Sequence, residues 1–388
     1  MKYKLSEIAL FNPTETLKKG TLAKKVGMDK LQSFCRDIPD YEIAEFSGGM
    51  KFRNGDTIMA RITPCLENGK TAKVNILDTE EVGFGSTEYI VFRAIDGVTD
   101  EDYLYYLVCS PIVRDIAIKS MVGSSGRQRV QTDVVKGIEV ELPTLDEQRK
   151  IGSLLKILDD KIAVNNEINE NLLEQALTMY AIQFAALDRN GCIGDYCSVK
   201  SGFAFKSSWW TTTGVKVIKI GSINQDNMNL SECSYVDEDK INKAKDFKVN
   251  AGDLLIAMTG ATIGKFAMVP YSSDTLLVNQ RVGKFFLGNN PVEKLPFIYC
   301  TLKQPDVYYE IVNRGQGSAQ PNISASDIMS IPCVIPSKEA INKFNKTIQA
   351  LFDLIISNQR ENHHLSTFRD SLLPKLMSGE IDVSKLDI

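Results

Sequence analysis

Polar segments hold the side chains of this sequence that could do chemistry. In the first half they are RITPCLENGKTAKV (61 to 74), GFGSTE (83 to 88) and GSSGRQRVQTD (123 to 133). The third combines a flexible Gly and Ser backbone with Arg127, Gln128 and Arg129, whose planar groups carry several hydrogen-bond donors. Such side chains suit base edges in the DNA major groove, Arg for guanine and Asn or Gln for adenine. An ordinary solvated surface loop has the same composition, so both interpretations stay open.

No segment has the spacing of an active site. GATIGK (260 to 265) resembles a phosphate-binding loop, but the interval between its glycines is one residue too short and Phe266 stands where Ser or Thr is needed. The two histidines, His363 and His364, are adjacent, and no GxSxG elbow is present. The sequence also lacks the Asn-Pro-Pro or Asp-Pro-Pro plus aromatic signature of an amino-methyltransferase. We therefore predict a non-catalytic chain with no cofactor and no metal.

Composition narrows the class of partner and compartment. The eight cysteines form no CxxC pair, so neither structural zinc nor disulfides are expected. The net charge of −4 argues against a polybasic, nonspecific nucleic-acid binder, although a local basic groove remains compatible with it. No apolar run is long enough to span a bilayer and the start lacks the apolar core of a signal peptide. We expect a cytoplasmic chain with no membrane partner.

A long predicted helix separates the polar segments of the two halves of the chain. Residues 145 to 186 contain no Pro and one Gly, and their apolar side chains follow the four-three alternation of a coiled-coil seam. The apolar seam residues are Ile151, Leu155, Leu158, Ile162, Leu172, Ala176 and Met179. Asn165 and Asn169 interrupt the seam. Buried asparagines fix register at a cost in stability, so this helix expects a specific partner.

The expected partner is a second helix in the same chain. Phe344, Ile348, Leu351, Ile355, Asn358, Asn362 and Leu365 repeat the frame at a constant offset (358 − 165 = 193), half of 388. The chain is a tandem duplication, each copy being a globular unit followed by a long helix. Antiparallel pairing would bring Asn165, Asn169, Asn358 and Asn362 together, as would parallel pairing, but it also lets the copies lie at opposite ends. Each helix packing only on its own unit is the alternative. Pro374 is expected to end the second helix.

The polar segments of the two copies correspond in position but differ in side chains. Ser86, Thr87 and Glu88 correspond to Asn279, Gln280 and Arg281, while Arg127 and Arg129 correspond to Gln320 and Asn322. This is expected of two reading units aimed at different targets, although ordinary loop divergence looks the same. The predicted DNA-binding residues are Arg61, Asn68, Lys70, Ser86, Thr87, Arg127, Gln128 and Arg129 in copy one, and Lys206, Thr259, Lys265, Asn279, Gln280, Arg281, Gln316, Gln320 and Asn322 in copy two.

Several stretches together resemble the DNA-specificity subunit of type I restriction-modification systems. They are RITPCLENGK and GFGSTEYIVFR in copy one, SGFAFKS and GDLLIAMTGATIGK in copy two, LPTLDEQRKIGSLLKILDDKIAVNNEINENLLE in the central helix and RDSLLPKLMSGEI near the C-terminus. Their order and spacing carry the likeness. One departure is that Asp146-Glu147-Gln148, at the head of the central helix, becomes Lys338-Glu339-Ala340 in the second copy.

The resemblance implies an α+β fold with two tandem target-recognition domains, separated by two long helices that pair as an antiparallel coiled coil in a pseudo-twofold arrangement. The implied boundaries are 1–144 and 188–336 for the recognition domains, and 145–187 and 337–388 for the helical regions. It also implies partners: double-stranded DNA with an asymmetric bipartite site, two modification subunits that methylate adenine, and restriction subunits that translocate and cleave. The alternative is a coiled-coil scaffold that binds proteins without sequence-specific DNA binding.

Overall fold

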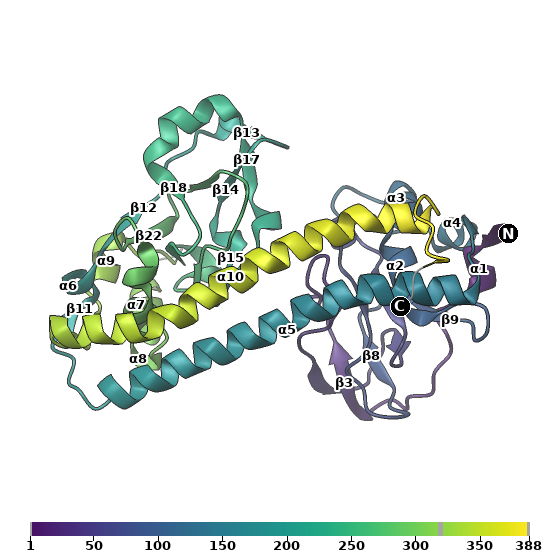
Figure 1. Ribbon diagram of the computed structural model, residues 1–388, viewed down its shortest axis with the longest axis horizontal. Helices are drawn as coiled ribbons and strands as arrows, with labels where there is room; N and C mark the ends of the chain where they lie inside the picture. The colour runs from purple at the N-terminus through teal and green to yellow at the C-terminus, as the bar shows by residue number, and fades with distance from the viewer. Residues whose placement is uncertain (1, 317–320, 386–388) are drawn as a thin grey trace. The chain divides into compact units, whose positions relative to one another are not determined.

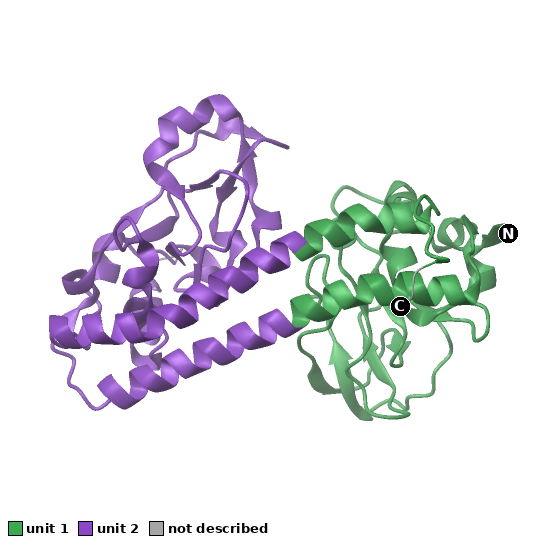
Figure 2. Ribbon diagram, viewed as in Figure 1, with its two compact units in different colours: residues 1–163, 365–388 green, residues 164–364 purple. Residues whose placement is uncertain are grey.

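The computed structural model describes residues 2–316 and 321–385. The chain divides into two compact units (Figure 2): unit 1 comprises residues 1–163 and 365–388, and unit 2 comprises residues 164–364. Each unit is built from one globular region together with segments of both long helices (Figure 1).

Unit 1 contains two four-stranded sheets and four short helices. The first sheet has the order β2-β9-β6-β7 and the second β4-β3-β8-β5, while β1 pairs separately with β10. The strands are β1 (Lys2–Lys4), β2 (Ala9–Phe11), β3 (Leu22–Val26), β4 (Glu42–Glu45), β5 (Lys51–Phe52), β6 (Thr57–Ala60), β7 (Thr71–Lys73), β8 (Gly83–Gly85), β9 (Tyr89–Ala94) and β10 (Glu139–Glu141). The short helices are α1 (Leu5–Ile8), α2 (Glu101–Cys109), α3 (Pro111–Lys119) and α4 (Thr132–Lys136).

The first sheet of unit 1 is buried on both faces. Along β6, Ile58 belongs to one core cluster while Met59 belongs to the other, and along β9 Ile90 and Val91 divide in the same way. This two-residue alternation is what a strand with side chains on opposite faces produces. The larger cluster also holds side chains of α2 and of both long helices, so the helices cover one face of the sheet.

Unit 2 repeats this plan with three additional strands, one in its second sheet and two in a separate small pair. Its sheets have the orders β12-β22-β19-β20 and β13-β17-β14-β21-β18, with the small pairs β11-β23 and β15-β16. The strands are β11 (Gly191–Cys192), β12 (Ser198–Ser201), β13 (Trp210–Thr211), β14 (Val215–Ile218), β15 (Ile223–Asn224), β16 (Asn227–Met228), β17 (Ser234–Val236), β18 (Lys248–Val249), β19 (Leu254–Ala257), β20 (Phe266–Met268), β21 (Leu276–Val278), β22 (Val282–Phe286) and β23 (Pro332–Cys333). The α-helices are α6 (Ile193–Tyr196), α7 (Leu295–Leu302), α8 (Pro305–Gly315) and α9 (Ala325–Met329). The 3-10 helices are η1 (Ser207–Trp209), η2 (Ile220–Ser222), η3 (Leu230–Glu232), η4 (Glu238–Phe247), η5 (Gly260–Thr262) and η6 (Pro291–Glu293).

The duplication predicted from the sequence extends to local hydrogen bonding. The short helices α1 and α6 open the two copies, and in both an acidic residue accepts a bond from the backbone just before the helix. Glu7 accepts from the Lys4 amide at 2.7 Å and Asp195 from the Cys192 amide at 2.8 Å. Such a bond satisfies an amide that the first helical turn leaves unpaired. In both units one strand pair is parallel, β3 with β8 and β14 with β21.

The long helices are α5 (Leu145–Phe184) and α10 (Lys338–Met377). The expectation that α10 ends at Pro374 is wrong: this proline lies inside the helix, which runs on to Met377. Leu376 and Met377 are buried in the core of unit 1, and that burial offsets the single backbone bond that a proline removes so close to the end of a helix. A turn follows the helix, with Gly379 at a φ of 74°.

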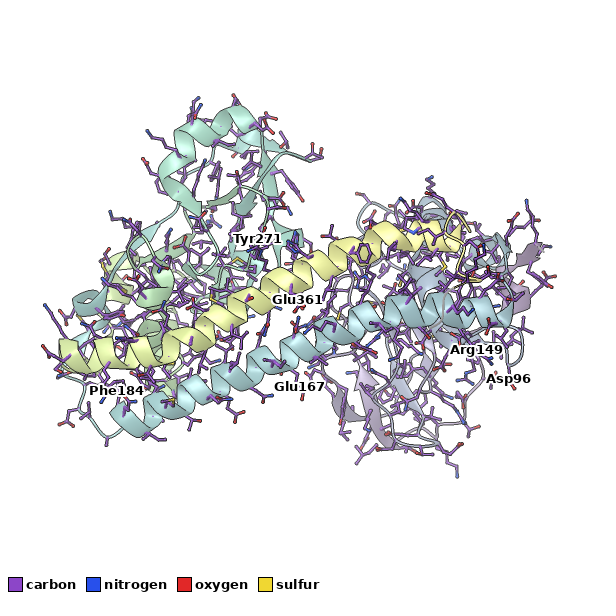
Figure 3. The ribbon with its side chains drawn as sticks, viewed as in Figure 1. Asp96, Arg149, Glu167, Phe184, Tyr271 and Glu361 are labelled. Atoms are coloured by element: carbon purple, nitrogen blue, oxygen red, sulfur yellow. The ribbon has the colours of Figure 1, made fainter. Side chains whose placement is uncertain are left out.

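The segments of α5 and α10 pack antiparallel within each unit. In unit 1 Asp159 of α5 accepts a hydrogen bond from Arg369 of α10. In unit 2 the amide of Asn165 donates to Asn362 at 2.8 Å and that of Asn358 donates to Asn169 at 2.9 Å. The predicted antiparallel pairing is therefore confirmed, and the asparagine amides meet in mutual hydrogen bonds. Asn165 also donates to the carboxylate of Glu361, which is labelled in Figure 3, at 2.8 Å.

Unit 2 continues this helix pair into an aromatic core. Phe184, labelled near the end of α5 in Figure 3, has its ring centroid 5.3 Å from that of Phe344 on α10 and 5.2 Å from that of Tyr180. Tyr180 is fully buried and shares a hydrogen bond with Thr301 at 3.1 Å. This aromatic packing holds the C-terminal end of α5 and the N-terminal part of α10 against α7.

Candidate nucleic-acid interface

Three polar segments of unit 1 are joined by main-chain hydrogen bonds at the end of β6. The Arg61 amide donates to the Glu88 carbonyl at 2.9 Å, and the Val130 amide donates to the Arg61 carbonyl at 2.8 Å. The Thr63 amide donates to the Gln128 carbonyl at 3.0 Å. The segment at 61 to 63 therefore lies between the turn at 86 to 88 and the segment at 127 to 130. We call this arrangement the three-segment frame.

Unit 2 builds the same frame from the corresponding segments. The Met258 amide donates to the Arg281 carbonyl at 3.0 Å, and the Ile323 amide donates to the Met258 carbonyl at 2.9 Å. An isolated antiparallel bridge joins Ile62 to Arg129 in unit 1, and its counterpart joins Thr259 to Asn322 in unit 2. The main chain thus brings corresponding positions together twice, with different side chains on it.

A charge cluster occupies the frame of unit 1. Arg129 donates from Nε to both carboxylate oxygens of Glu88 at 3.0 Å, and from Nη2 to Oε1 at 2.7 Å. Arg61 adds a third charge, its Nε lying 4.0 Å from Glu88 Oε2. The hydrogen bonds from Arg129 hold the pKa of Glu88 below its ordinary value, and Glu88 in turn raises that of Arg129. The pair stays ionised at neutral pH.

The other predicted DNA-binding residues of unit 1 differ in solvent exposure and in hydrogen bonding. Arg127 and Thr87 are exposed, and Gln128 is half-buried. The Ser86 hydroxyl accepts a bond from the Glu88 amide at 3.1 Å and so shapes the turn. Six of the predicted residues therefore lie on the three-segment frame: Arg61, Ser86, Thr87, Arg127, Gln128 and Arg129.

The loop that follows β6 returns to the frame through its main chain only. The Lys70 carbonyl accepts from the Ala60 amide at 3.0 Å, but the Lys70 ammonium points elsewhere and donates to the Met28 carbonyl at 2.9 Å. Asn68 is exposed on the same loop. The structure thus gives Lys70 a local structural contact that the sequence did not indicate.

The turn at 279 to 281 in unit 2 presents two exposed side chains. Asn279 is 8% exposed, and its side-chain oxygen accepts from the Arg281 amide at 3.2 Å. Gln280 and Arg281 are exposed, and the Gln280 amide donates to the Phe203 carbonyl at 2.9 Å. Asn279 therefore stabilises the turn, while Gln280 and Arg281 are free to meet a ligand.

The remaining residues of unit 2 cluster around the end of β19. The Lys265 carbonyl accepts from the Ala257 amide at 2.8 Å, the counterpart of the bond between Lys70 and Ala60. Asn322 is exposed and its amide donates to the Gly315 carbonyl at 2.9 Å, next to the exposed Gln316. Thr259 is half-buried, and its hydroxyl has no hydrogen-bond partner among the described residues. Gln320 lies outside the described residues.

Lys206 lies outside the frame. Its ammonium is 5.8 Å from the ring centroid of Trp209, a distance suited to a cation–π contact. Trp209 stacks on Phe203 with centroids 6.1 Å apart. Since Phe203 pairs with Asn279 in an isolated bridge, the aromatic group supports the 279 to 281 turn from behind.

Glu88 and Met258 belong to the frame but were not among the predicted site residues. The sequence did hold a signal for Glu88, because it corresponds to Arg281 in the second copy. The two copies share the main chain at this position but carry an acidic side chain in one and a basic side chain in the other. The fold therefore does not require either side chain.

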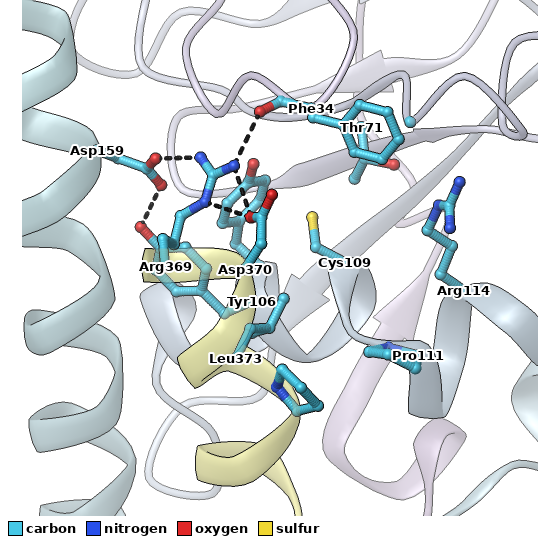
Figure 4. A pocket seen from close by; sticks show the side chains of 13 residues that line it. Phe34, Thr71, Tyr106, Cys109, Pro111, Arg114, Asp159, Arg369, Asp370 and Leu373 are labelled. Atoms are coloured by element: carbon cyan, nitrogen blue, oxygen red, sulfur yellow. Dashed lines mark hydrogen bonds and ion pairs between the residues drawn. The ribbon is translucent and has the colours of Figure 1, made fainter. Parts of the chain in front are cut away.

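A cavity of about 230 Å³ in unit 1 provides a second candidate site (Figure 4). Both of its acids are paired: Arg369 donates to Asp159 and to Asp370, and the Tyr106 hydroxyl donates to Asp159 at 2.6 Å. Arg114, which also lines the cavity, donates to the Glu67 carbonyl at 2.8 Å. Burial raises the pKa of the Cys109 thiol to about 12, so this sulfur is protonated at neutral pH. The cavity therefore offers neither an activated nucleophile nor an unpaired acid.

The described residues hold no cluster of three or more His, Cys, Asp or Glu side chains able to bind a metal ion. All eight cysteines are free thiols, and Cys197, Cys233, Cys300 and Cys333 are buried, as expected of small core residues. Within residues 2–316 and 321–385, no helix combines the length and the apolar character needed to cross a membrane.

The chain matches the family model described as "Type I restriction modification DNA specificity domain" over residues 1–174 and 189–366. It is 26% identical over 319 residues to the type I restriction enzyme MjaIX specificity subunit of Methanocaldococcus jannaschii, covering 75% of this chain and 71% of that one. Against the MjaVIII specificity subunit of the same organism the identity is 21% over 326 residues, covering 79% and 76%. A crystal structure of a type I restriction-modification S subunit from M. genitalium covers 97% of this chain and 96% of that one, at 15% identity and a TM-score of 0.49.

The family-model match confirms the resemblance to type I DNA-specificity subunits. The family model covers both copies of the duplication, each with the frame described above. Its description is that of a specificity domain rather than of a catalytic one, in agreement with the predicted non-catalytic role. The chain belongs to the type I restriction-modification DNA specificity family.

Proposed function

We propose that the two units each read one half of an asymmetric, bipartite DNA site. Membership in a DNA specificity family gives the class of function. The finer assignment rests on one observation: the main-chain bonds at Arg61 and Met258 are alike, while the side chains on the two frames differ. A shared main chain gives both units the same approach to a duplex, and different side chains then select different bases.

The proposed readers are exposed or half-buried side chains on the frame or beside it. In unit 1 they are Arg127, Gln128 and Arg129, and in unit 2 they are Gln280, Arg281, Asn322 and Gln316. Lys265 and Lys206 are assigned to the DNA backbone, because a point charge on a flexible stem fits a phosphate better than a base pattern. Ser86 and Asn279 stabilise the two turns through their side-chain hydrogen bonds, and we assign Thr87 and Thr259 to DNA contacts beside the readers.

We further propose that the chain acts in the cytoplasm within a complex of two modification subunits and restriction subunits. The relatives are specificity subunits of type I restriction enzymes by name. A recognition chain with no catalytic group of its own needs partners that supply methylation and cleavage. These partner subunits also supply cationic side chains that bind DNA phosphates in this proposal, which reconciles DNA binding with a net charge of −4.

The proposed boundaries follow the duplication: recognition domains at 1–144 and 188–336, with helical regions at 145–187 and 337–388. The compact units cut across them, because unit 1 ends inside α5 and takes up residues 365–388. We regard the compact units as recognition domains together with the helix segments that pack on them.

A binding selection over randomised duplexes with the reconstituted complex tests the proposal. We expect two unlike half-sites separated by unspecified bases. Arg127→Ala should relax one position of the first half-site only, and Gln280→Ala one position of the second only. Two identical halves would contradict the assignment of one reader set to each unit. Binding without sequence preference would favour the protein-binding scaffold.

A further inference from the structure

We infer that Arg129 reads a guanine in the half-site of unit 1 and that Glu88 is the residue that positions it. This inference rests on the proposed function. It adds the identity of one base and assigns a specificity role to Glu88, a side chain that the sequence did not place among the readers.

The edge of the guanidinium that Glu88 occupies determines what Arg129 can still bind. Glu88 takes Nε, at 3.0 Å from both of its oxygens, and one N–H of Nη2, at 2.7 Å from Oε1. A guanidinium has five N–H donors in a rigid plane. The end edge, with one N–H from Nη1 beside the second N–H of Nη2, is left for a ligand. It offers two parallel donors.

Two parallel donors match one base in the major groove. Guanine presents N7 and O6, two adjacent acceptors. Adenine pairs its N7 acceptor with an N6 donor, thymine has one acceptor beside a methyl group, and cytosine presents a donor. Only guanine accepts both bonds from the free edge of Arg129, so the geometry selects it by chemistry rather than by shape alone.

Arg129 is held in place at both its main chain and its side chain. Its amide donates to the Val122 carbonyl at 2.9 Å, and its carbonyl accepts from the Val122 amide at 3.0 Å. Its side chain is still 48% exposed, against 25% for Glu88. An arginine fixed at one edge and open at the other loses less rotamer entropy on binding, which strengthens discrimination between bases. Arg127 has no such support among the described residues.

A carboxylate close to DNA would repel phosphates unless cations offset it. Arg61 supplies the second cation: its Nε lies 4.0 Å from Glu88 Oε2, and its Nη2 donates to the Val130 carbonyl at 3.5 Å. One carboxylate between two guanidinium groups leaves the cluster with a net positive charge. Unit 2 places Arg281 and Asn322 at the corresponding positions and so lacks this device, which makes the guanine assignment specific to unit 1.

The test compares Glu88→Gln and Arg129→Ala with wild type in the reconstituted complex, by binding selection and by titration. Glu139→Gln serves as the control, because it removes the same charge from an exposed position on β10. We expect one guanine in the first half-site to be preferred roughly 5- to 150-fold over other bases. Both variants should lose most of that preference at the same position. Glu88→Gln should bind unrelated duplex as well as wild type or better, since a negative charge is gone.

A 7-deazaguanine duplex separates base reading from a general loss of structure. Replacing N7 by carbon at that position removes one acceptor, so wild type should bind this duplex roughly tenfold more weakly. Arg129→Ala should show no such penalty, and Glu88→Gln a reduced one. The inference is overturned if wild type selects its site but either variant keeps the guanine preference, or if Arg129→Ala keeps the 7-deaza penalty. A wild-type complex with no sequence preference at all would instead overturn the proposed function, and this inference with it.

Discussion

Asp159 on α5 accepts a hydrogen bond from Arg369 on α10, and the corresponding positions of unit 2 hold Phe352 and Ala176 (159 + 193 = 352; 369 − 193 = 176). Tyr106 donates to Asp159 at 2.6 Å, whereas its counterpart Tyr299 lies edge-on to Phe352 with ring centroids 5.5 Å apart. The same place in the duplicated fold is thus a buried ion pair in one unit and an apolar contact in the other.

We expect unit 1 to tolerate replacement of both members of this ion pair by the apolar residues of unit 2, but not replacement of one member alone. Arg369→Met leaves Asp159 buried without its cation, and we expect the free energy of unfolding to fall by about 3–5 kcal/mol. Asp159→Phe combined with Arg369→Ala reproduces the unit 2 side chains at these two positions and should recover part of that loss. The recovery is incomplete because the Tyr106 hydroxyl loses its acceptor, whereas that of Tyr299 donates to Asp226 at 2.8 Å. Urea unfolding of the full chain measures both. Equal losses in the single and double variants would show that the ion pair is not the source of the effect.

The buried asparagines should trade stability for register. Asn169 and Asn358 are each 8% exposed and hydrogen-bonded to one another, so changing both to Leu removes a matched pair and leaves no orphaned partner. We expect a higher melting temperature in calorimetry together with a tendency to self-associate. Asn171→Leu, at an exposed position of α5, should change little. A lower melting temperature for the double variant in a monomeric chain would contradict this role.

Acid should destabilise unit 1 through Glu15. Burial alone would raise the pKa of this carboxyl, but hydrogen bonds from Arg93 at 2.6 Å and ion pairing with Arg53 at 2.8 Å hold the pKa below its ordinary value of 4.5. A lowered folded-state pKa contributes stability that is present above pH 4.5 and is lost as pH falls through the folded value. Unfolding free energy measured from pH 7 to pH 3 should therefore decline.

The matching variant is Glu15→Gln, which cannot ionise. It should be less stable than wild type at pH 7 and should decline less steeply in acid, so that the two curves converge. Parallel curves would mean that other carboxyl groups carry the acid sensitivity.

Lys265 and Lys70 occupy corresponding positions but should respond differently to alanine. Lys265→Ala should weaken binding to all sequences alike and reduce the slope of log affinity against log salt by about 1, as loss of one phosphate contact does. The Lys70 ammonium already donates to the Met28 carbonyl at 2.9 Å, so Lys70→Ala should reduce stability by about 1 kcal/mol and leave the slope unchanged. Salt-series titrations with the complex separate the two outcomes.

The sequence predicted the features that depend on periodicity and on repetition. The offset of 193 indicated the duplication and the pairing of the two long helices, and it matched Glu88 with Arg281 and Arg129 with Asn322. It did not match Arg61 with Met258, which are 197 residues apart (258 − 61 = 197). It could not show that Arg129 bonds to Glu88, because these residues are 41 apart and only tertiary folding brings them together. The sequence also did not predict that α10 continues beyond Pro374. Local propensity favours a helix end at a proline, whereas burial of Leu376 stabilises the last residues of the helix.

The bonds that the frames of the two units share, at Arg61 and at Met258, are bonds between main-chain atoms. Replacing a side chain there leaves the amides and carbonyls in place, so the fold is indifferent to which residues stand at positions such as 88 and 281. A substitution at such a position therefore changes the side chain that the frame presents while leaving the shared main-chain bonds in place. The side chains that determine the specificity of such a protein can therefore vary independently of the main-chain bonds that stabilise it.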